Sequence, residues 1–150
     1  MIEWIVTFVL SWIMFALLID RQLLKYTLWG GITAIILQLI VDTSADAMGI
    51  YHVMAQLKLG GGSVFFTFGA VFTMGTIFVQ FIPINRWLKI LHILATATLF
   101  LGLEYLLVQR SIITYHNWGM GLSWLTNLVV FITITWLAET FNFNKKTNSF

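Results

Sequence analysis

Three acidic side chains lie within long apolar stretches of this 150-residue sequence, at Asp42, Asp46 and Glu104. An acid placed in membrane hydrocarbon costs at least ~2.5–3.5 kcal/mol on insertion scales, so each of the three indicates a function or a specific partner. Gln38 lies four residues before Asp42, and Asp46 lies four residues after it. This spacing places the three side chains on one face of a helix, where they could act together.

Carboxylates at this spacing could do several kinds of chemistry. Together with the imidazoles of His52 and His116, they could hold a divalent metal ion. One carboxylate could instead keep its proton and serve as a proton donor or relay, with Asp42 or Glu104 as the candidate catalytic acid. The acids could also pair with basic side chains or backbone groups and only fix the packing of helices. The sequence leaves structural pairing, proton or ion handling, a metal site and acid catalysis open.

Aromatic and polar side chains near the acids complete a candidate site. A Tyr-His pair follows each acid-bearing stretch, and Trp118 follows the second pair. Asn127 shares a helix face with Ser123 and Thr126 near the beginning of the last apolar stretch. The predicted ligand-binding residues are Gln38, Asp42, Asp46, Tyr51, His52, Glu104, Tyr115, His116, Trp118 and Asn127. The sequence identifies neither a cofactor nor a particular metal.

The composition indicates that these residues belong to a membrane protein. The chain is 59% apolar and 9% charged, with a mean hydropathy of +0.90, whereas soluble domains have about 25% charged and about 45–50% apolar residues. A soluble fold of this length could not bury so much apolar surface. The absence of Cys excludes disulfides, thiol nucleophiles and Cys-ligated zinc. The eight Lys and Arg are scattered, so we expect no nucleic-acid partner.

Five apolar stretches predict an all-α fold, an integral membrane bundle of five transmembrane helices in a single domain, 1–150. The stretches cover about 2–19, 26–50, 63–82, 87–108 and 118–137. A helix crosses the hydrocarbon core with about 20 residues, so each stretch is long enough, the first only just. The stretches are continuously apolar, whereas the strands of a membrane barrel would alternate between apolar and polar residues.

The basic residues predict the orientation of this bundle. Six share one side (Arg21, Lys25, Arg86, Lys89, Lys145 and Lys146), and two, Lys58 and Arg110, lie on the other. Because cytoplasmic connections are rich in Lys and Arg, we expect the N-terminus outside and the C-terminus in the cytoplasm. The formal charge is then −2 in the outer half and +4 in the inner half, which predicts one acidic polar cavity open to the outside. The expected partner is the lipid bilayer, with a homo-oligomer or a membrane-protein partner left open.

The two outward connections resemble each other, which suggests an internal repeat. Asp42 precedes the pair Tyr51-His52, and Glu104 precedes Tyr115-His116. A parallel duplication would relate the helical hairpin of the second and third spans to that of the fourth and fifth, by a pseudo-two-fold axis along the membrane normal. Coincidence is the alternative, because the chain is rich in aromatic residues.

These motifs carry two resemblances. The chain length, the five spans and the segments Asp42…Gly49-Ile50-Tyr51 and Glu104…Tyr115-His116-Asn117-Trp118 resemble a family of small uncharacterised membrane proteins of spore-forming Gram-positive bacteria. That resemblance implies a multi-pass protein of the bacterial plasma membrane and no established activity. More distantly, Asp42-x6-Gly49-Ile50-Tyr51 is similar to the lycopene cyclase repeat family, membrane enzymes that cyclise carotenoid ends by acid chemistry. The sequence has Gly60-Gly61-Gly62-Ser63 where that family has Pro-x-Glu-Glu.

Two functional hypotheses follow. The first is a non-enzymatic membrane protein whose outward-facing acidic cavity binds a small ligand or cation, or docks a membrane partner. The second is an intramembrane enzyme that acts on an isoprenoid or another lipid by acid catalysis. In that enzyme Glu104 or Asp42 would donate the proton, and Tyr51, Tyr115 and Trp118 would stabilise cationic intermediates.

Overall fold

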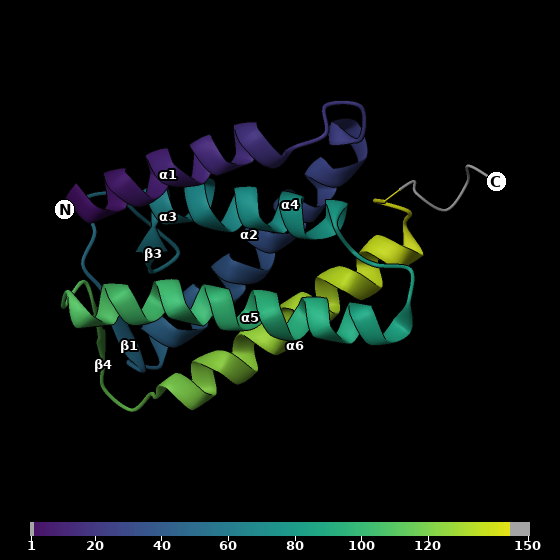
Figure 1. The fold of residues 1–150 in the computed structure, drawn as a ribbon. Coiled ribbons are helices and arrows are strands. Elements are labelled where there is room, and N and C mark those ends of the chain that lie inside the picture. Colours follow the sequence, from purple (N-terminus) through teal and green to yellow (C-terminus); the bar gives the residue numbers. More distant parts are fainter. Residues whose placement is uncertain (1, 145–150) are drawn as a thin grey trace.

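Residues 2–144, the part of the chain that the computed structural model describes, fold into a mostly helical bundle (Figure 1). Its helices are α1 (Ile2–Leu18), α2 (Leu24–Ala47), α3 (Val64–Phe66), the π-helical η1 (Thr67–Val71), α4 (Phe72–Gln80), α5 (Arg86–Gln109) and α6 (Met120–Thr140). Because α3, η1 and α4 are continuous along the chain, residues 2–144 form five helical segments. Lys145 and Lys146, which the predicted orientation also uses, lie outside the described residues.

Three of these helices, α2, α5 and α6, are long and apolar enough to cross a membrane. The other two helical segments, Ile2–Leu18 and Val64–Gln80, are apolar but shorter. The predicted stretches at 26–50 and 118–137 differ from α2 and α6 by two or three residues at each end. Large apolar side chains are exposed on the outer faces of the bundle, as on Leu17 (78%) and Leu99 (68%). These exposed faces suit contact with lipid, in which apolar surface needs no cover.

The prediction of an all-α fold misses two small antiparallel sheets. β1 (Tyr51–Val53) pairs with β4 (Ile113–Tyr115), and β2 (Lys58–Leu59) pairs with β3 (Gly62–Ser63). β1 and β4 are three residues long and far apart in the sequence, so no local alternation of apolar and polar residues marks them. They form because the connections after α2 and α5 meet in space and satisfy each other's backbone groups.

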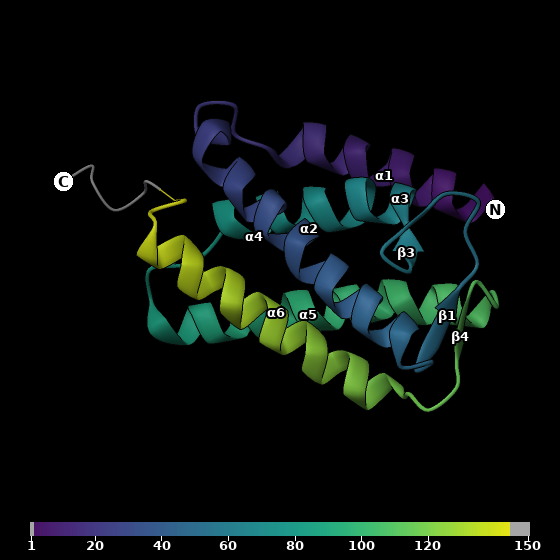
Figure 2. The same cartoon turned by 180° about the vertical axis from the view of Figure 1, so that it is seen from behind.

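The helices form two layers with α2 between them. Figures 1 and 2 show α1 beside the segment from α3 to α4, α5 beside α6, and α2 crossing the bundle between the two pairs. The sheets and the start of α1 gather at one end, here called the strand end. The connections 19–23 and 81–85 lie at the other end, here called the turn end. The described ends of the chain therefore lie at opposite ends of the bundle.

Small residues bring α2 and α4 close together. A Cβ atom added to Gly75 would lie 2.5 Å from the Cβ of Ala34 and 2.9 Å from the carbonyl oxygen of Gly30. Gly31 is in similarly close contact with Thr76 and with the backbone of Phe72. Membrane helices associate through such small-residue faces, because lipid gives them no hydrophobic drive to pair. This contact fixes α2, and with it the level at which Asp42 lies in the bundle.

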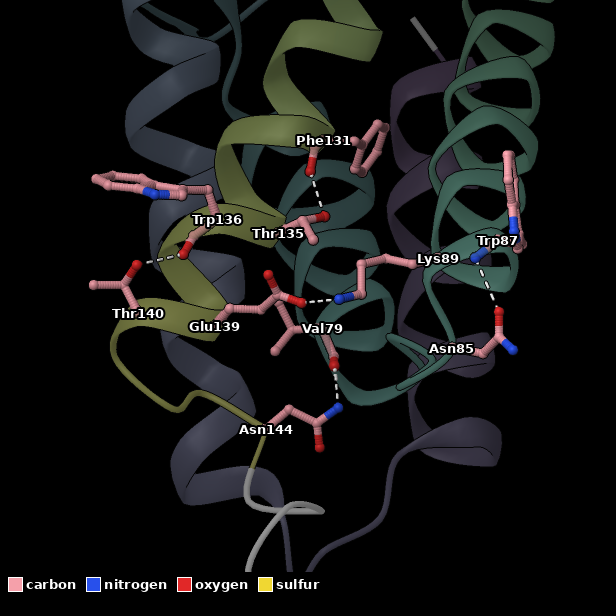
Figure 3. Close-up of polar contacts among 10 residues, drawn as sticks. All are labelled: Val79, Asn85, Trp87, Lys89, Phe131, Thr135, Trp136, Glu139, Thr140 and Asn144. Carbon is pink, nitrogen blue, oxygen red and sulfur yellow. Dashed lines mark hydrogen bonds and ion pairs between the residues drawn. The ribbon is translucent and has the colours of Figure 1, made fainter.

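Polar contacts close the turn end (Figure 3). The Asn85 side chain accepts a hydrogen bond from the backbone N–H of Trp87 (2.9 Å) and so caps α5. Lys89 of α5 forms an ion pair with Glu139 of α6. Asn144 donates from Nδ2 to the carbonyl oxygen of Val79 (3.0 Å) and ties the segment after α6 to α4. The polar groups of this end are thus used in joining elements.

The contact between α2 and α4 generates a stability prediction. Gly75→Ala should destabilise the fold by about 1–3 kcal/mol, because the added methyl group has no space. Thermal unfolding in lipid nanodiscs, followed by circular dichroism, would measure the change. Gly102→Ala on α5 is the matched control, since nothing lies within 4 Å of its added Cβ. A Gly75→Ala protein that melts at the same temperature as Gly102→Ala would contradict the predicted close packing.

Candidate functional site

A cavity of about 50 Å³ lies between the helices at the strand end. A water molecule needs at least ~10–15 Å³ of such space, so the cavity has room for a few waters or one small ligand. Its polar wall comes from three helices and two strands. The lining residues are Trp4, Gln38, Val41, Asp42, Tyr51, Val53, Gly62, Ser63, Phe66, Phe100, Glu104, Ile113, Trp118, Ser123, Thr126, Asn127 and Val130.

Asp42 provides the more deeply buried of the two acids in this wall. Its side chain is 4% exposed. The Oδ1 atom accepts hydrogen bonds from Gln38 Nε2 (2.8 Å) and from Tyr51 Oη (2.5 Å). Gln38 reaches Asp42 because residues four apart lie one above the other on a helix. Tyr51 comes from β1, so the carboxylate is held jointly by its own helix and by the sheet.

The run of three glycines packs on this part of α2. Gly60 and Gly61 form the turn between β2 and β3 with positive φ angles of 57° and 86°, a conformation that strains other residues. A Cβ atom on Gly62 would lie only 2.1 Å from Oδ2 of Asp42. The glycines therefore allow the β2–β3 hairpin to lie directly against Asp42 and to close one side of the cavity.

Glu104 of α5 provides the second acid, with donors from two other elements. Its Oε1 atom accepts hydrogen bonds from Tyr115 Oη (2.5 Å) and from Ser123 Oγ (2.8 Å). Ser123 in turn accepts a hydrogen bond from Trp118 Nε1 (2.6 Å). Each donor has a single proton to give, and this arrangement uses each proton once. The network links α5, β4 and the beginning of α6 around one carboxylate.

No Lys or Arg side chain contributes to this network. All four donors to the two carboxylates are neutral, and no basic residue lines the cavity. Within residues 2–144, neither acid forms an ion pair with Lys58 or Arg110, the structural partners that the sequence left open. The cavity wall therefore contains two acids and no cationic side chain to balance them.

The sheet of β1 and β4 separates the tyrosines from the histidines. Tyr51 and Tyr115 are directly opposite each other in the antiparallel register, and His52 is opposite Thr114. Because successive strand residues point to opposite faces, both tyrosines reach the carboxylates while His52 points away. His116 follows Tyr115 and is exposed, as is His52. A Tyr-His pair in a strand cannot place both rings in one site.

The structure thus divides the predicted site residues into two groups. Six of the ten line the cavity together: Gln38, Asp42, Tyr51, Glu104, Trp118 and Asn127. Tyr115 contacts Glu104 from outside the lining. The other three, Asp46, His52 and His116, lie around an open groove on the far side of the sheet. Asp46 is exposed because α2 ends one residue later and the chain leaves the bundle.

Sequence reasoning missed several residues of the cavity wall. Ser63 directly follows the three glycines and is 1% exposed. Trp4, near the beginning of α1, is 3% exposed and donates from Nε1 to the carbonyl oxygen of Met54 (2.7 Å). Phe66 packs edge-on against Trp4, and Phe100 packs against Phe66 at a tilt, with ring centroids 5.6 Å apart. Only the glycine run gave a local signal, since it indicates a close approach of backbone to another group.

The ends of α2 and α5 share a local pattern. Each helix is followed by a residue with positive φ, Gly49 (64°) and Ser111 (57°), and by the hydrogen bonds of a Schellman cap. Asp42 and Glu104 are 62 residues apart, and so are Gly49 and Ser111. The first residues of β1 and β4 have the same separation. The Tyr-His pairs are 64 residues apart and do not follow this offset. The likeness of the two connections therefore lies in the helix ends.

Burial keeps both tyrosines of the sheet in their hydrogen-bond-donating form. Burial raises the pKa of Tyr51, and the negative charge of Asp42 raises it further. Burial also raises the pKa of Tyr115, followed by its hydrogen bond to Glu104. An isolated tyrosine has a pKa of about 10, so both phenols stay neutral at any physiological pH.

Comparison with protein-family models, with curated proteins and with solved structures finds no match to this chain. Within residues 2–144, no three His, Asp or Glu side chains come close enough together to hold a metal ion. A proposed function must therefore rest on the cavity itself, with its two acids, its neutral hydrogen-bond donors and its aromatic rings.

The raised pKa values generate a prediction for alkaline titration. Between about pH 9 and 11 the wild type and the double variant Tyr51→Phe, Tyr115→Phe should gain equal tyrosinate absorbance, because the raised pKa values keep Tyr51 and Tyr115 from contributing. The folded state holds these two protons more tightly than the unfolded chain. Their contribution to stability is therefore present below about pH 10 and lost as the pH rises. A double variant that gains clearly less absorbance than the wild type would contradict the placement of these two phenols beside the acids.

Proposed function

We propose that this chain is a multi-pass protein of a bacterial plasma membrane with five transmembrane helices. Support comes from α2, α5 and α6, which are long and apolar enough to cross a bilayer. The two shorter segments have 17 residues each, which at 1.5 Å per residue gives ~25 Å. The hydrocarbon core is ~30 Å thick, and local thinning of the bilayer accommodates the difference. The bacterial location rests on the family resemblance of the motifs.

The same proposal places the strand end and its cavity on the outer side. Arg21, Lys25 and Arg86 lie at or next to the turn end, as does Lys89 in the first turn of α5. The strand end has Lys58 in β2, and Arg110 directly after α5. By the positive-inside rule, the turn end then faces the cytoplasm and the N-terminus lies outside.

We infer that the cavity binds a small cation. The observation that carries this inference is the convergence of Asp42 and Glu104, from two helices, on one cavity without a basic residue in its wall. In a bilayer an uncompensated carboxylate is costly, so a cation that enters the cavity gains the attraction of both acids. The hydrogen bonds from the tyrosines orient the carboxylates without neutralising them.

Aromatic rings around the acids support a cationic occupant. Tyr51 lies 6.3 Å from Trp118 and 6.4 Å from Tyr115, measured between ring centroids. Trp4 packs against Phe66 with centroids 5.7 Å apart, in the same lining. The faces of aromatic rings attract cations, most strongly where water is excluded. Carboxylates together with ring faces suit an ammonium-type cation better than a small, strongly hydrated divalent ion.

The alternative function, acid catalysis on an isoprenoid or another lipid, has less support. The cavity volume of about 50 Å³ is well below the ~150 Å³ that accommodates one benzene molecule in an engineered cavity. We therefore do not infer an enzymatic activity.

The cation proposal can be tested by binding measurements on purified protein in nanodiscs. Methylammonium chloride should quench or shift the fluorescence of the cavity tryptophans Trp4 and Trp118 in a saturable way. Asp42→Asn and Glu104→Gln should each weaken binding at least ~10-fold, because each removes one of two charges that face the ligand. Calorimetry would confirm the affinities independently of fluorescence.

Asp46→Asn is the matched control for this measurement. It removes an acid from the same helix, one turn away, that lies outside the cavity. Its affinity for methylammonium should stay within about two-fold of the wild type. Equal losses in Asp46→Asn and Asp42→Asn would show a general charge effect and contradict the site. A wild type that binds neither methylammonium nor sodium or potassium ions would contradict the cation proposal and favour a docking role for the strand end.

A further inference from the structure

Two polar atoms in the cavity wall have no partner among the described residues. Ser63 Oγ and Asn127 Nδ2 are buried and form no hydrogen bond, and both residues line the cavity that holds the acids. Ser63 is the last residue of β3, and Asn127 lies on α6, one helical turn beyond Ser123. Buried polar groups are almost always hydrogen-bonded, so two polar atoms without a partner in one small cavity indicate that the cavity binds an occupant.

The position of Ser63 makes its lack of a partner informative. It is the residue that precedes α3, where a serine hydroxyl usually accepts a hydrogen bond from the first turn of the helix. Here the side chain makes no such cap, although the backbone is in the extended conformation that allows it. The residue is 1% exposed, so bulk water does not replace the missing bond. Its hydroxyl is therefore available only to something inside the cavity.

The unpaired atoms and the acids have complementary requirements. Asp42 and Glu104 accept hydrogen bonds and attract positive charge, whereas the amide N–H of Asn127 needs an acceptor. The hydroxyl of Ser63 can donate or accept. A simple alkylammonium ion offers donors only and would leave the Asn127 amide unsatisfied. An occupant that satisfies the whole wall has to combine a cationic donor group with an acceptor oxygen.

We propose that the occupant is a small amino-alcohol cation. Its ammonium nitrogen and its oxygen are carried by two adjacent carbon atoms. This inference rests on the proposed cation binding and specifies its ligand class. The ammonium group would lie at Asp42 and Glu104, and the oxygen would accept from Asn127 and pair with Ser63. The 2-aminoethanol unit has this chemistry. It occurs both as free ethanolammonium and as the headgroup of phosphatidylethanolamine.

The proposal is tested by comparing two cations that differ by one oxygen. Wild-type protein in nanodiscs of phosphatidylcholine should bind ethanolammonium about 10-fold more tightly than ethylammonium, because sites built to bond an oxygen discriminate against analogues that lack it. Ser63→Ala and Asn127→Leu should each reduce this preference to about two-fold or less. Both variants should lose less affinity for ethylammonium than for ethanolammonium, since both acids remain.

Apo-protein stability separates recognition of the oxygen from a structural role. Removal of a buried hydroxyl without a partner deletes no hydrogen bond, so Ser63→Ala should melt at the wild-type temperature or above. A variant that loses both the preference and thermal stability would indicate damage to the fold and count against the proposal. Conversely, a stable Ser63→Ala protein without the preference supports it.

The remaining outcomes distinguish this inference from the proposal beneath it. Equal affinity of the wild type for the two cations would overturn the amino-alcohol proposal but not the proposal of cation binding. In that case water would satisfy the two unpaired atoms. Loss of binding to both cations in the wild type would overturn cation binding itself. Nanodiscs that contain phosphatidylethanolamine identify the source. If this lipid weakens the binding of added ethanolammonium, the occupant is the lipid headgroup. If the affinity for ethanolammonium is unchanged, the occupant is the free amine.

Discussion

The pairing of β1 with β4 is the interaction on which the candidate site depends. Six residues, from connections far apart in the sequence, place Tyr51 opposite Tyr115 and so bring one phenol to each of the two acids. Without this pairing, Asp42 would keep only Gln38 and Glu104 only Ser123 as donors. A carboxylate in a low-dielectric interior needs such donors whether or not it is ionised. The short sheet therefore supplies hydrogen-bond donors to the acids, as Lys or Arg partners do in other proteins, but it adds no positive charge to the cavity.

The glycines determine where that sheet can form. Close packing of Gly30 and Gly31 against α4 sets the position of α2, and Gly61 and Gly62 let the β2–β3 hairpin lie on its last turns. These contacts carry the end of α2 to the level of the end of α5, so the two connections meet. The short run of π-helix between α3 and α4 lies in the segment that α2 packs against. Such π-helical turns frequently occur near functional sites.

The sequence predicted the parts of this structure that depend on local patterns. Continuous apolar runs predicted the helices, and the cost of acids in apolar surroundings pointed to Asp42 and Glu104, which do share a cavity. Asp46 was assigned to the same site by its helical spacing from Asp42, but it lies in the last turn of α2, where the helix leaves the bundle. The histidines were assigned by proximity in the sequence, past the ends of α2 and α5. There the period changes from 3.6 to 2, which turns alternate residues away. Ser63 and Phe100 were missed because only tertiary packing brings them to the acids.

The two ends of the bundle differ in a way that bears on how an occupant enters. Beyond the cavity, a smaller space of about 20 Å³ continues from Gln38 and Asn127 toward the turn end and is lined by apolar side chains. Past it, Phe78, Val79 and Ile134 are 0–2% exposed and fill the interior. The ion pair of Lys89 with Glu139 and the contact of Asn144 with Val79 close the turn end outside this packing. A polar occupant that crossed this layer would lose its hydrogen bonds in the cavity and would have to displace these closely packed side chains. Exchange through the strand end, where the wall consists of short loops and two small sheets, requires far less rearrangement, so the proposed occupant would enter and leave from that side.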